Sequence, residues 1–202
     1  ASLKYQLSKV DNKNALVSQR LKRYPSILSK LERNPGMKLA RMQDVGGIRA
    51  VVKNMREVRS IESAYKNGTR VFTKIDGGKD YINFPKDSGY RSVHMIFKCR
   101  NGFSIELQIR TTIQHAWATA VETMGTFLKF SLKSGEGPKE WLNFFSLASS
   151  AFAILESTPR APEHDKYSAQ EVYQMLIDQE QELDVIGTLS AFKVAARHIE
   201  ND

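Results

Sequence analysis

Residues 103–110 read Phe-Ser-Ile-Glu-Leu-Gln-Ile-Arg, and apolar and polar side chains alternate along this stretch. Alternation with a period of two predicts a β-strand, because successive side chains point to opposite faces. The three aliphatic side chains would then face a core. The polar side chains would form one row on the other face: Glu106, Gln108 and Arg110. A solvated outer face gives the same alternation, so the pattern alone leaves open whether this row has a function.

A second strand-like segment, residues 92–98, precedes this one, and Asn101-Gly102 between them favours a hairpin turn. The turn length decides which residues face each other. A two-residue turn would place Met95 opposite Gln108, whereas a longer loop or a bulge would place His94 there. We favour the second pairing, which brings His94 beside the polar row.

Periodicity and capping signals predict the other elements. Two further strands are expected, at residues 48–52 and 69–75. Five helices are expected, at residues 26–33 with Ser26 as N-cap, 55–65, 113–132, 139–156, and 168–198 with a capping box. Strands mixed with helices and followed by a helical tail predict an α/β or α+β fold, a mixed β-sheet flanked by helices.

The charge is distributed unevenly along the 202 residues, whose formal net charge is +8. The first hundred residues hold 22 Lys and Arg against 8 Asp and Glu, so their net charge is +14. A basic surface attracts anions such as nucleotides or nucleic acid, although a merely solvated basic face gives the same count. No apolar run approaches the ~18 residues of a membrane span, and the single cysteine, Cys99, favours a reducing cytoplasm.

A basic segment near the start of the chain has the geometry of a phosphate site. Ser26, Lys30 and Arg33 recur at i, i+4 and i+7 and would share one helix face. Arg20 and Lys22 alternate just before them, so four cations could converge near the start of the helix. Cations and helix N-termini are what a triphosphate requires. An exposed, lysine-rich helix is the alternative.

Asp44 stands just before a predicted buried strand, beside two glycines. A carboxylate in such a position could approach Mg²⁺, or Mn²⁺ in its place, because these hard cations accept a few carboxylates together with phosphate oxygens. Glu106 would be its partner. Alternatively, Asp44 is a turn residue that pairs with Arg41 or Arg49. Motifs for zinc, for a P-loop and for dinucleotide binding are absent from the sequence.

The loop before the first hairpin strand, KDSGYRSVH at residues 86–94, surrounds one glycine with cations. Gly89 permits an unusual backbone, and Tyr90 offers a flat face on which a base could stack. Lys86, Arg91 and His94 add positive charge or hydrogen-bond donors. The loop therefore suits a second nucleotide, although a tyrosine in a loop can also be a simple packing residue.

Taken in order, these segments resemble the synthetase domain of the RelA/SpoT alarmone family. The resemblance covers about residues 20–125. It rests on residues 20–30 (RLKRYPSILSK), 44–49 (DVGGIR), 79–82 (KDYI), 86–94 (KDSGYRSVH), 106–111 (ELQIRT) and 114–118 (QHAWA). It implies a nucleotidyltransferase-like fold, with a synthetase domain at residues 1–156 and a helical extension at 157–202 that serves oligomerisation or regulation.

The resemblance also implies an activity, transfer of the β,γ-diphosphate of ATP to the 3′-hydroxyl of GDP or GTP in the cytoplasm. Arg20 and Arg49 would sandwich the adenine. The ATP phosphates would be held by Lys22, Ser26, Lys30 and Arg33. Asp44 and Glu106 would bind Mg²⁺, and Glu106 would take the proton of the acceptor hydroxyl. The acceptor would be held by Lys79, Lys86, Tyr90, His94, Gln108 and Arg110.

Two departures from the family pattern lie on the acceptor side, Ser88 where many members have Asn, and Gly77-Gly78 where bifunctional members carry a charged residue. The resemblance therefore leaves a toxin-type reading open, in which the acceptor is the 3′ CCA end of tRNA or an adenosine nucleotide, and an antitoxin is a partner. Homo-oligomers are typical of small members. A silent nucleotide-binding regulator and a plain RNA-binding module are further alternatives.

Overall fold

The computed structural model describes residues 15–66 and 72–200 and divides into two compact units. Unit 1 contains the described residues up to Tyr81 together with Ser92–Thr112. Unit 2 contains Ile82–Arg91 together with the residues from Ile113 onward. Neither unit ends at residue 156, so the expected boundary between a synthetase domain and a helical extension at that residue stays a prediction.

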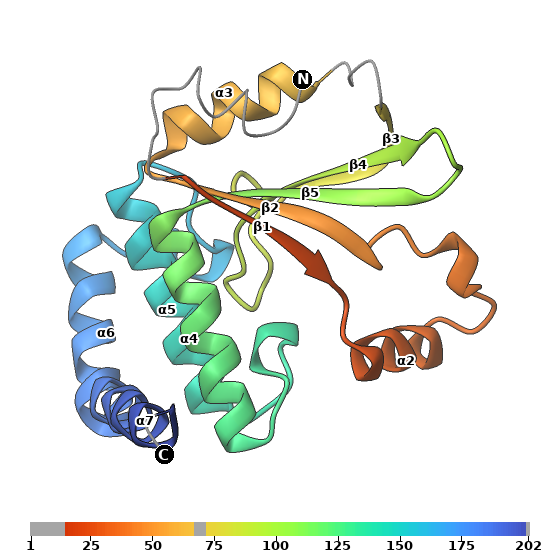
Figure 1. Ribbon diagram of the computed structural model, residues 1–202. Coiled ribbons are helices and arrows are strands. Elements are labelled where there is room, and N and C mark those ends of the chain that lie inside the picture. The colour runs from red at the N-terminus through yellow and green to blue at the C-terminus, as the bar shows by residue number, and fades with distance from the viewer. Residues whose placement is uncertain (1–14, 67–71, 201–202) are drawn as a thin grey trace. The chain divides into compact units, whose positions relative to one another are not determined.

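Unit 1 is built on a five-stranded sheet with the order β1-β2-β5-β4-β3 (Figure 1). Its strands are β1 (Leu16–Leu21), β2 (Gly46–Val52), β3 (Phe72–Asp80), β4 (Val93–Cys99) and β5 (Ser104–Thr111). The sequence predicts a mixed sheet and four of these strands, but not β1. The central pair, β2 and β5, is parallel, and every other pair is antiparallel. The strand that carries the polar row therefore has a neighbour on each side.

Helix α3 (Met55–Tyr65) runs along one face of this sheet (Figure 1), at the bounds that the sequence predicts. It begins at Asn54, whose side chain accepts a hydrogen bond from the backbone N–H of Glu57. Val58 and Ile61 are fully buried, so their apolar face forms the core of unit 1 with the sheet. Glu106 and its neighbours point to the opposite face.

Helix α2 (Tyr24–Arg33) begins earlier than expected. Arg23, not Ser26, is its N-cap, and no side chain bonds to the first turn. The prediction treated Pro25 as lying outside the helix. Proline is instead favoured in the first turn, because its missing N–H would have no partner there and its φ suits a helix. The short 3₁₀ turn η1 (Leu39–Arg41) follows.

Strand β3 extends past its expected end at residue 75 as far as Asp80, and residues 69–71 of the prediction lie outside the described residues. The extra length is accommodated by a shift in register between Ile75 and Lys79. Gly77, at φ +109°, and Gly78 lie in this bulge, and a Cβ on Gly78 would be 2.8 Å from the carbonyl oxygen of His94. The sequence signal that seemed to end the strand is therefore a bulge within it.

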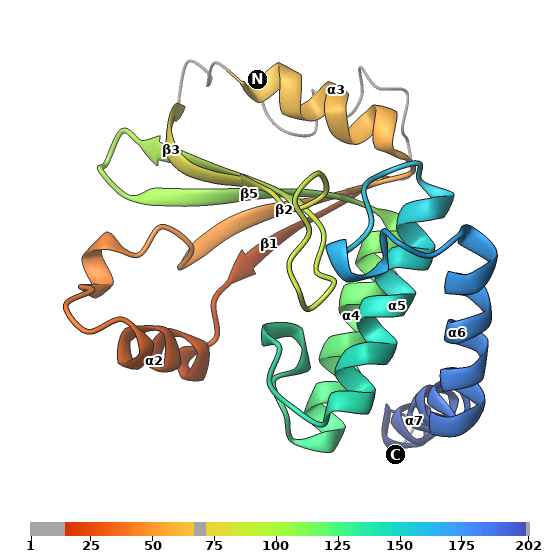
Figure 2. The same ribbon diagram turned by 180° about the vertical axis from the view of Figure 1, so that it is seen from behind.

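Unit 2 consists of the loop Ile82–Arg91 and a group of helices, of which α4, α5 and α6 lie side by side (Figure 2). The helices are α4 (Thr112–Leu128), η2 (Leu132–Ser134), α5 (Lys139–Leu155), η3 (Pro162–His164), α6 (Ala169–Leu183) and α7 (Val185–Glu200). Leu147, Ala151 and Val172 form a buried cluster between α5 and α6. Within the described residues, no helix is both long and apolar enough to cross a membrane.

The C-terminal helical segment differs from the prediction in one respect. The capping box of Ser168 and Glu171 is confirmed, but the single long helix is wrong. Asp184 adopts a left-handed conformation at φ +45° and ends α6, and α7 starts at the next residue. Similarly, α4 ends at Leu128 rather than at residue 132, because Lys129 takes φ +59° and turns the chain.

Candidate active site

The polar row of β5 lies between complementary residues on both neighbouring strands. Across β4, His94 is paired with Gln108 and Ile96 with Glu106, which confirms the register with the longer loop. Across β2, Gly47 is paired with Glu106 and Arg49 with Gln108. Directly paired residues point to the same face of a sheet. The row is therefore part of a polar surface in unit 1 that spans several strands.

The backbone approaches closely at Gly47. A Cβ built on this glycine would lie 2.5 Å from the carbonyl oxygen of Glu106. That separation is far inside van der Waals contact, so only glycine fits beside Glu106 without displacing a strand. The second glycine of the Gly46-Gly47 pair thus has a structural reason at the site itself, whereas a Cβ on Gly46 would meet no atom within 4 Å.

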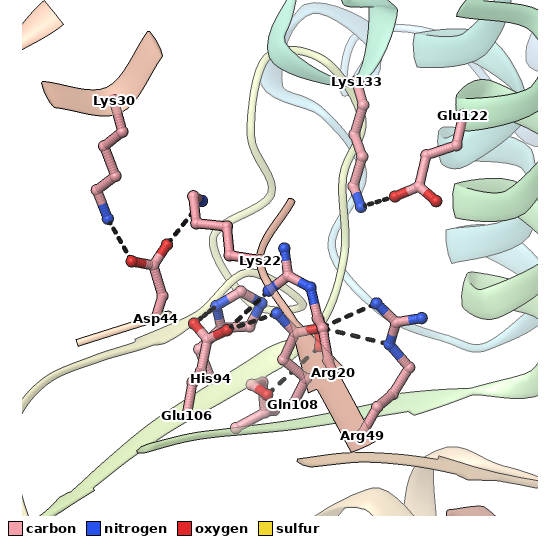
Figure 3. A network of polar contacts seen from close by, with 12 residues as sticks. Arg20, Lys22, Lys30, Asp44, Arg49, His94, Glu106, Gln108, Glu122 and Lys133 are labelled. Carbon is pink, nitrogen blue, oxygen red and sulfur yellow. Dashed lines mark hydrogen bonds and ion pairs between the residues drawn. The ribbon is translucent and has the colours of Figure 1, made fainter. Parts of the chain in front are cut away.

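Glu106 is the centre of a hydrogen-bonded cluster and is only 7% exposed (Figure 3). Its Oε2 accepts a hydrogen bond of 2.6 Å from Nε2 of Gln108 and lies 3.3 Å from Nη1 of Arg20. Its Oε1 lies 2.7 Å from Nδ1 of His94, a contact that is ionic only when His94 is protonated. Burial raises the pKa of Glu106, but the His94 and Gln108 hydrogen bonds and the nearby charges outweigh it and hold the pKa below its usual value. Glu106 is therefore an anion at neutral pH.

The two arginines expected around adenine lie on neighbouring strands. Arg20 of β1 is paired with Gly47, two residues before Arg49 on β2, so both arginines point to the face of the polar row. Nε and Nη2 of Arg49 both lie 3.4 Å from Oε1 of Gln108. Both guanidinium groups therefore lie at the polar row, that of Arg20 against Glu106 and that of Arg49 against Gln108.

Asp44 lies in a turn before β2 and pairs with two lysines (Figure 3). Nζ of Lys22 is 3.0 Å from its Oδ2, and Nζ of Lys30 is 2.9 Å from its Oδ1. The expected alternative partners, Arg41 and Arg49, are not the ones in these contacts. Burial raises the pKa of Asp44, but the hydrogen bonds and charges of the two lysines hold it below its usual value.

Only part of the expected phosphate-binding group is therefore gathered in one place. Lys22 and Lys30 meet at Asp44, whereas Ser26 is exposed on α2. Arg33 is exposed as well, and its Nε donates to the backbone oxygen of Ser29 one turn earlier. Of the predicted helix face, Lys30 thus contacts Asp44, Arg33 contacts its own helix and Ser26 is exposed, so phosphate binding by these residues stays a prediction.

The remaining unit 1 residues expected to bind the acceptor differ in burial. Lys79 is exposed on β3, where it is paired with His94 after the bulge. Arg110 is 1% exposed and continues the polar row on β5. His94 and Gln108 belong to the Glu106 cluster described above. Lys79 is thus the exposed cation of this set, whereas Arg110 is almost fully buried.

The other expected acceptor residues belong to unit 2, on the loop Ile82–Arg91. Tyr90 is 4% exposed, which corrects the expectation of an open stacking face. Two ammonium groups lie over its ring, with Nζ of Lys133 5.0 Å and Nζ of Lys86 5.6 Å from the centroid. Trp117 of α4 lies on the ring's flank, with 6.5 Å between the centroids. A base can stack on Tyr90 only if a lysine moves aside.

A buried network that the sequence did not reveal fixes this loop to α5. Ser149 Oγ donates a hydrogen bond of 2.6 Å to the carbonyl oxygen of Gly89 and accepts one of 2.8 Å from Nε of Arg91. Nη1 of Arg91 donates to the backbone oxygens of Ile82 and Pro159. Burial lowers the pKa of Arg91 to about 10, against the opposing charge of Glu156. These contacts determine the backbone on either side of Tyr90.

Two carboxylates of unit 1, Asp44 and Glu106, are suited to bind a magnesium ion that phosphate oxygens of a ligand also coordinate. Asp44 and Glu106 are anionic, because neighbouring donors lower both pKa values. Across the part of the chain that the structure describes, no three side chains of His, Cys, Asp or Glu gather as a metal cluster. Mg²⁺ commonly needs only one or two carboxylates when substrate phosphates and water complete its coordination.

Comparison with known proteins identifies the family. The model of a region found in RelA / SpoT proteins matches residues 19–126, more than half of the chain. The GTP pyrophosphokinase YjbM of Bacillus subtilis is 31% identical over 112 residues, which are 51% of this chain and 52% of that protein. A guanosine-3′,5′-bis(diphosphate) 3′-pyrophosphohydrolase of Aquifex aeolicus is 30% identical over 127 residues, 62% of this chain and 17% of that protein. The chain thus spans about half the length of the first of these relatives and less of the second.

Solved structures agree with this assignment. The small alarmone synthetase 1 of Bacillus subtilis bound to its product pppGpp is similar with a TM-score of 0.62 and 26% identity, over 77% of this chain and 84% of that one. A GTP pyrophosphokinase family protein of Streptococcus pneumoniae shares the fold, with a TM-score of 0.58, 22% identity and coverage of 94% and 86%. The Glu106 cluster, the basic Asp44 site and the matched region lead to one conclusion: this chain belongs to the RelA/SpoT family and has the fold of the small alarmone synthetases.

Proposed function

We propose that this protein is an ATP-dependent pyrophosphokinase that makes (p)ppGpp. In this reaction the 3′-oxygen of GDP or GTP forms a bond to the β-phosphorus of ATP, the bond from that phosphorus to the α,β-bridging oxygen breaks, and AMP leaves. The hydroxyl proton passes to a base or to water. The observation that carries the proposal is the anionic Glu106 held among Arg20, His94 and Gln108. The name of YjbM, a GTP pyrophosphokinase, supports the same reaction.

The donor nucleotide would occupy the basic face of unit 1. Lys22 and Lys30 are already desolvated in part against Asp44, and a triphosphate would offer them more negative charge than one carboxylate does. We infer that ATP takes over these two ammonium groups and leaves Asp44 available for a metal ion. Arg20 and Arg49 would pack on the adenine, since a guanidinium is planar and stacks on aromatic rings.

Glu106 would orient and polarise the acceptor hydroxyl rather than remove its proton in advance. Its lowered pKa makes it a weak base, but its position is set by three hydrogen-bonding side chains. Precise orientation suits phosphoryl-type transfer, in which positioning and neutralisation of charge supply most of the rate. A carboxylate that accepts the hydroxyl hydrogen bond increases the electron density on the attacking oxygen.

Asp44 and Glu106 are the side chains that would hold Mg²⁺, or Mn²⁺ in its place. When bound, the ion would neutralise phosphate charge on the donor. On the acceptor side, Lys79, Lys86 and Arg110 would supply positive charge, and His94 and Gln108 hydrogen bonds. Tyr90 would stack on the base after the lysines over its ring have moved.

The proposal is tested by following the γ-phosphate label of ATP in the presence of Mg²⁺. Parallel reactions contain GDP, GTP, no second nucleotide, or deacylated tRNA. Label on the guanosine nucleotide is the expected result. Transfer only to adenosine nucleotides or to the tRNA 3′ end would contradict the proposal and identify a toxin-type enzyme, and absence of transfer would leave a nucleotide-binding regulator.

The variant Glu106→Gln provides the matched control, because it keeps the shape of the side chain. We expect at least about a 10³-fold loss of transfer with little change in ATP affinity, since the residue acts on the acceptor hydroxyl. Unchanged turnover would exclude Glu106 from catalysis.

Assembly and location are further proposals. Two exposed apolar side chains, Ile177 of α6 and Ile186 of α7, provide a surface on which a homo-oligomer or an antitoxin could assemble. The single free cysteine, Cys99, is in keeping with a cytoplasmic protein. Size-exclusion chromatography with light scattering would give the oligomeric state directly.

A further inference from the structure

Lys133 lies over the ring of Tyr90 although it falls outside the segment that the family model matches, residues 19–126. It belongs to η2, in the turn between α4 and α5. Its ammonium nitrogen is closer to the ring centroid than that of Lys86, 5.0 Å against 5.6 Å. The residue therefore lies where the acceptor base would stack, within unit 2 alone.

The backbone that carries Lys133 is held in place. Leu132, directly before it, is 2% exposed and anchors η2 in the helical unit. Gly135 ends the turn at φ +83°, and Gly137, at φ +151°, leaves no side chain where a Cβ would lie 2.6 Å from Leu132. The position of Lys133 is therefore a property of the fold.

The side chain of Lys133 is less restrained than its backbone. Its ammonium group pairs with Glu122 of α4 (Figure 3), whose side chain is 56% exposed. An ion pair with so exposed a partner is screened by water and contributes little stability. The ion pair with Glu122 therefore adds little to what holds the ammonium group of Lys133 over the ring of Tyr90.

We propose that Lys133 is a specificity-determining residue that selects a guanine base in the acceptor pocket. The inference rests on the proposed function only in taking a nucleotide as the ligand of Tyr90. A base that stacks on this ring must displace the ammonium group, which then lies at the edge of the base. Guanine presents two acceptors there, O6 and N7, whereas adenine presents the donor N6 beside N7. A lysine favours the first arrangement and is opposed by the second.

Charge and shape can be separated by the variant Lys133→Met, which keeps an unbranched apolar stem and removes the ammonium group. Equilibrium binding of GDP, IDP and ADP is measured by calorimetry without ATP. IDP keeps O6 and N7 but lacks the 2-amino group. We expect GDP and IDP to bind about tenfold more weakly or worse, as for a base read by a good donor, and ADP to change by less than about twofold.

Two further variants make the measurement specific. Lys139→Met removes an exposed lysine at the start of α5 and should leave all three affinities unchanged. Glu122→Gln removes the counter-ion and should leave GDP binding equal or tighter, because Lys133 no longer has to be withdrawn from it. Weaker GDP binding in this variant would contradict the role of Glu122 as a mere resting partner.

An equal loss of GDP and ADP in Lys133→Met would overturn the inference, because the lysine would then read the phosphates that both nucleotides share. Unchanged GDP binding, or no binding of GDP to the unaltered protein, would overturn it as well. The label-transfer assay keeps this result apart from the proposed function. If GDP binding depends on Lys133 but no label is transferred, the guanine pocket is supported and the pyrophosphokinase activity is contradicted. If label is transferred to GDP but Lys133→Met keeps the base preference of the unaltered protein, the activity is supported and the role of Lys133 is contradicted.

Discussion

Ser149→Ala removes one oxygen atom from the buried network that holds the Tyr90 loop. Ser149 is 2% exposed, donates to the Gly89 carbonyl oxygen at 2.6 Å and accepts from Nε of Arg91 at 2.8 Å. A neutral hydrogen bond contributes about 1 kcal/mol and one to a charged group about 1.5–3 kcal/mol. Because Arg91 is only 3% exposed, water cannot easily replace the lost partner. We therefore expect a destabilisation of about 2.5–4 kcal/mol.

For a chain of this length, that change lowers Tm by about 5–15 °C. Differential scanning calorimetry of the variant measures it, with Thr119→Ala as control, since Thr119 is exposed and bonds only within α4. Nucleotide titrations should in addition show weaker GDP binding and unchanged ATP binding, because the residues proposed to bind ATP belong to unit 1. A Tm within about 2 °C of that of the unaltered protein would refute the reasoning.

Three other predictions concern the carboxylates, a glycine and a helix cap. Folding lowers the pKa values of Asp44 and Glu106, so both carboxylates contribute stability above the ordinary carboxyl pKa of about 4, and this stability is lost as the pH falls through the lowered values. Between pH ~5 and ~3, the Tm of Asp44→Asn should therefore fall less steeply than the Tm of the unaltered chain. Parallel curves of Tm against pH would argue against the pairing of Asp44 with the two lysines. Gly47→Ala should destabilise the protein by about 1–3 kcal/mol in urea unfolding, since its Cβ collides with a backbone oxygen 2.5 Å away, and an unchanged midpoint would mean that the strands separate freely. Ser168→Ala should cost about 1 kcal/mol by losing the cap of α6, a loss that thermal circular dichroism detects and that Glu171→Gln should reproduce only in part.

The register of the β4–β5 hairpin was one of the two that the sequence allowed, and the favoured one is confirmed. The period of two on β5 set which side chains share a face, and placing His94 opposite Gln108 decided the loop length of the hairpin. The helical spacing of α2 likewise put Lys30 on the helix face that contacts Asp44. Such patterns determine on which face of its own helix or strand a side chain lies, but they do not determine which residue it contacts. That is why Arg33 shares the predicted face and nevertheless bonds within its own helix.

Contacts between distant segments were beyond the sequence patterns. Nothing local says that Lys22 and Lys30 would converge on Asp44, since three separate segments must fold before they meet. Ser149 had a weak signal, a hydroxyl in the otherwise apolar helix α5, because a buried hydroxyl has to find a partner. The break at Asp184 had none, because aspartate takes the left-handed conformation only occasionally and no glycine or proline marks the position.

The parallel pairing of β2 with β5 has a consequence for the order of folding. Arg49 and Gln108 are direct neighbours in the sheet, yet 59 positions separate them along the chain. Closing so long a segment costs chain entropy before any contact across it is gained, so non-local strand pairs form late. Helical circular dichroism should therefore return early during refolding. If unit 1 holds ATP as proposed, ATP binding should return only with the slowest phase, because Arg49 reaches Gln108 only after β2 and β5 have paired.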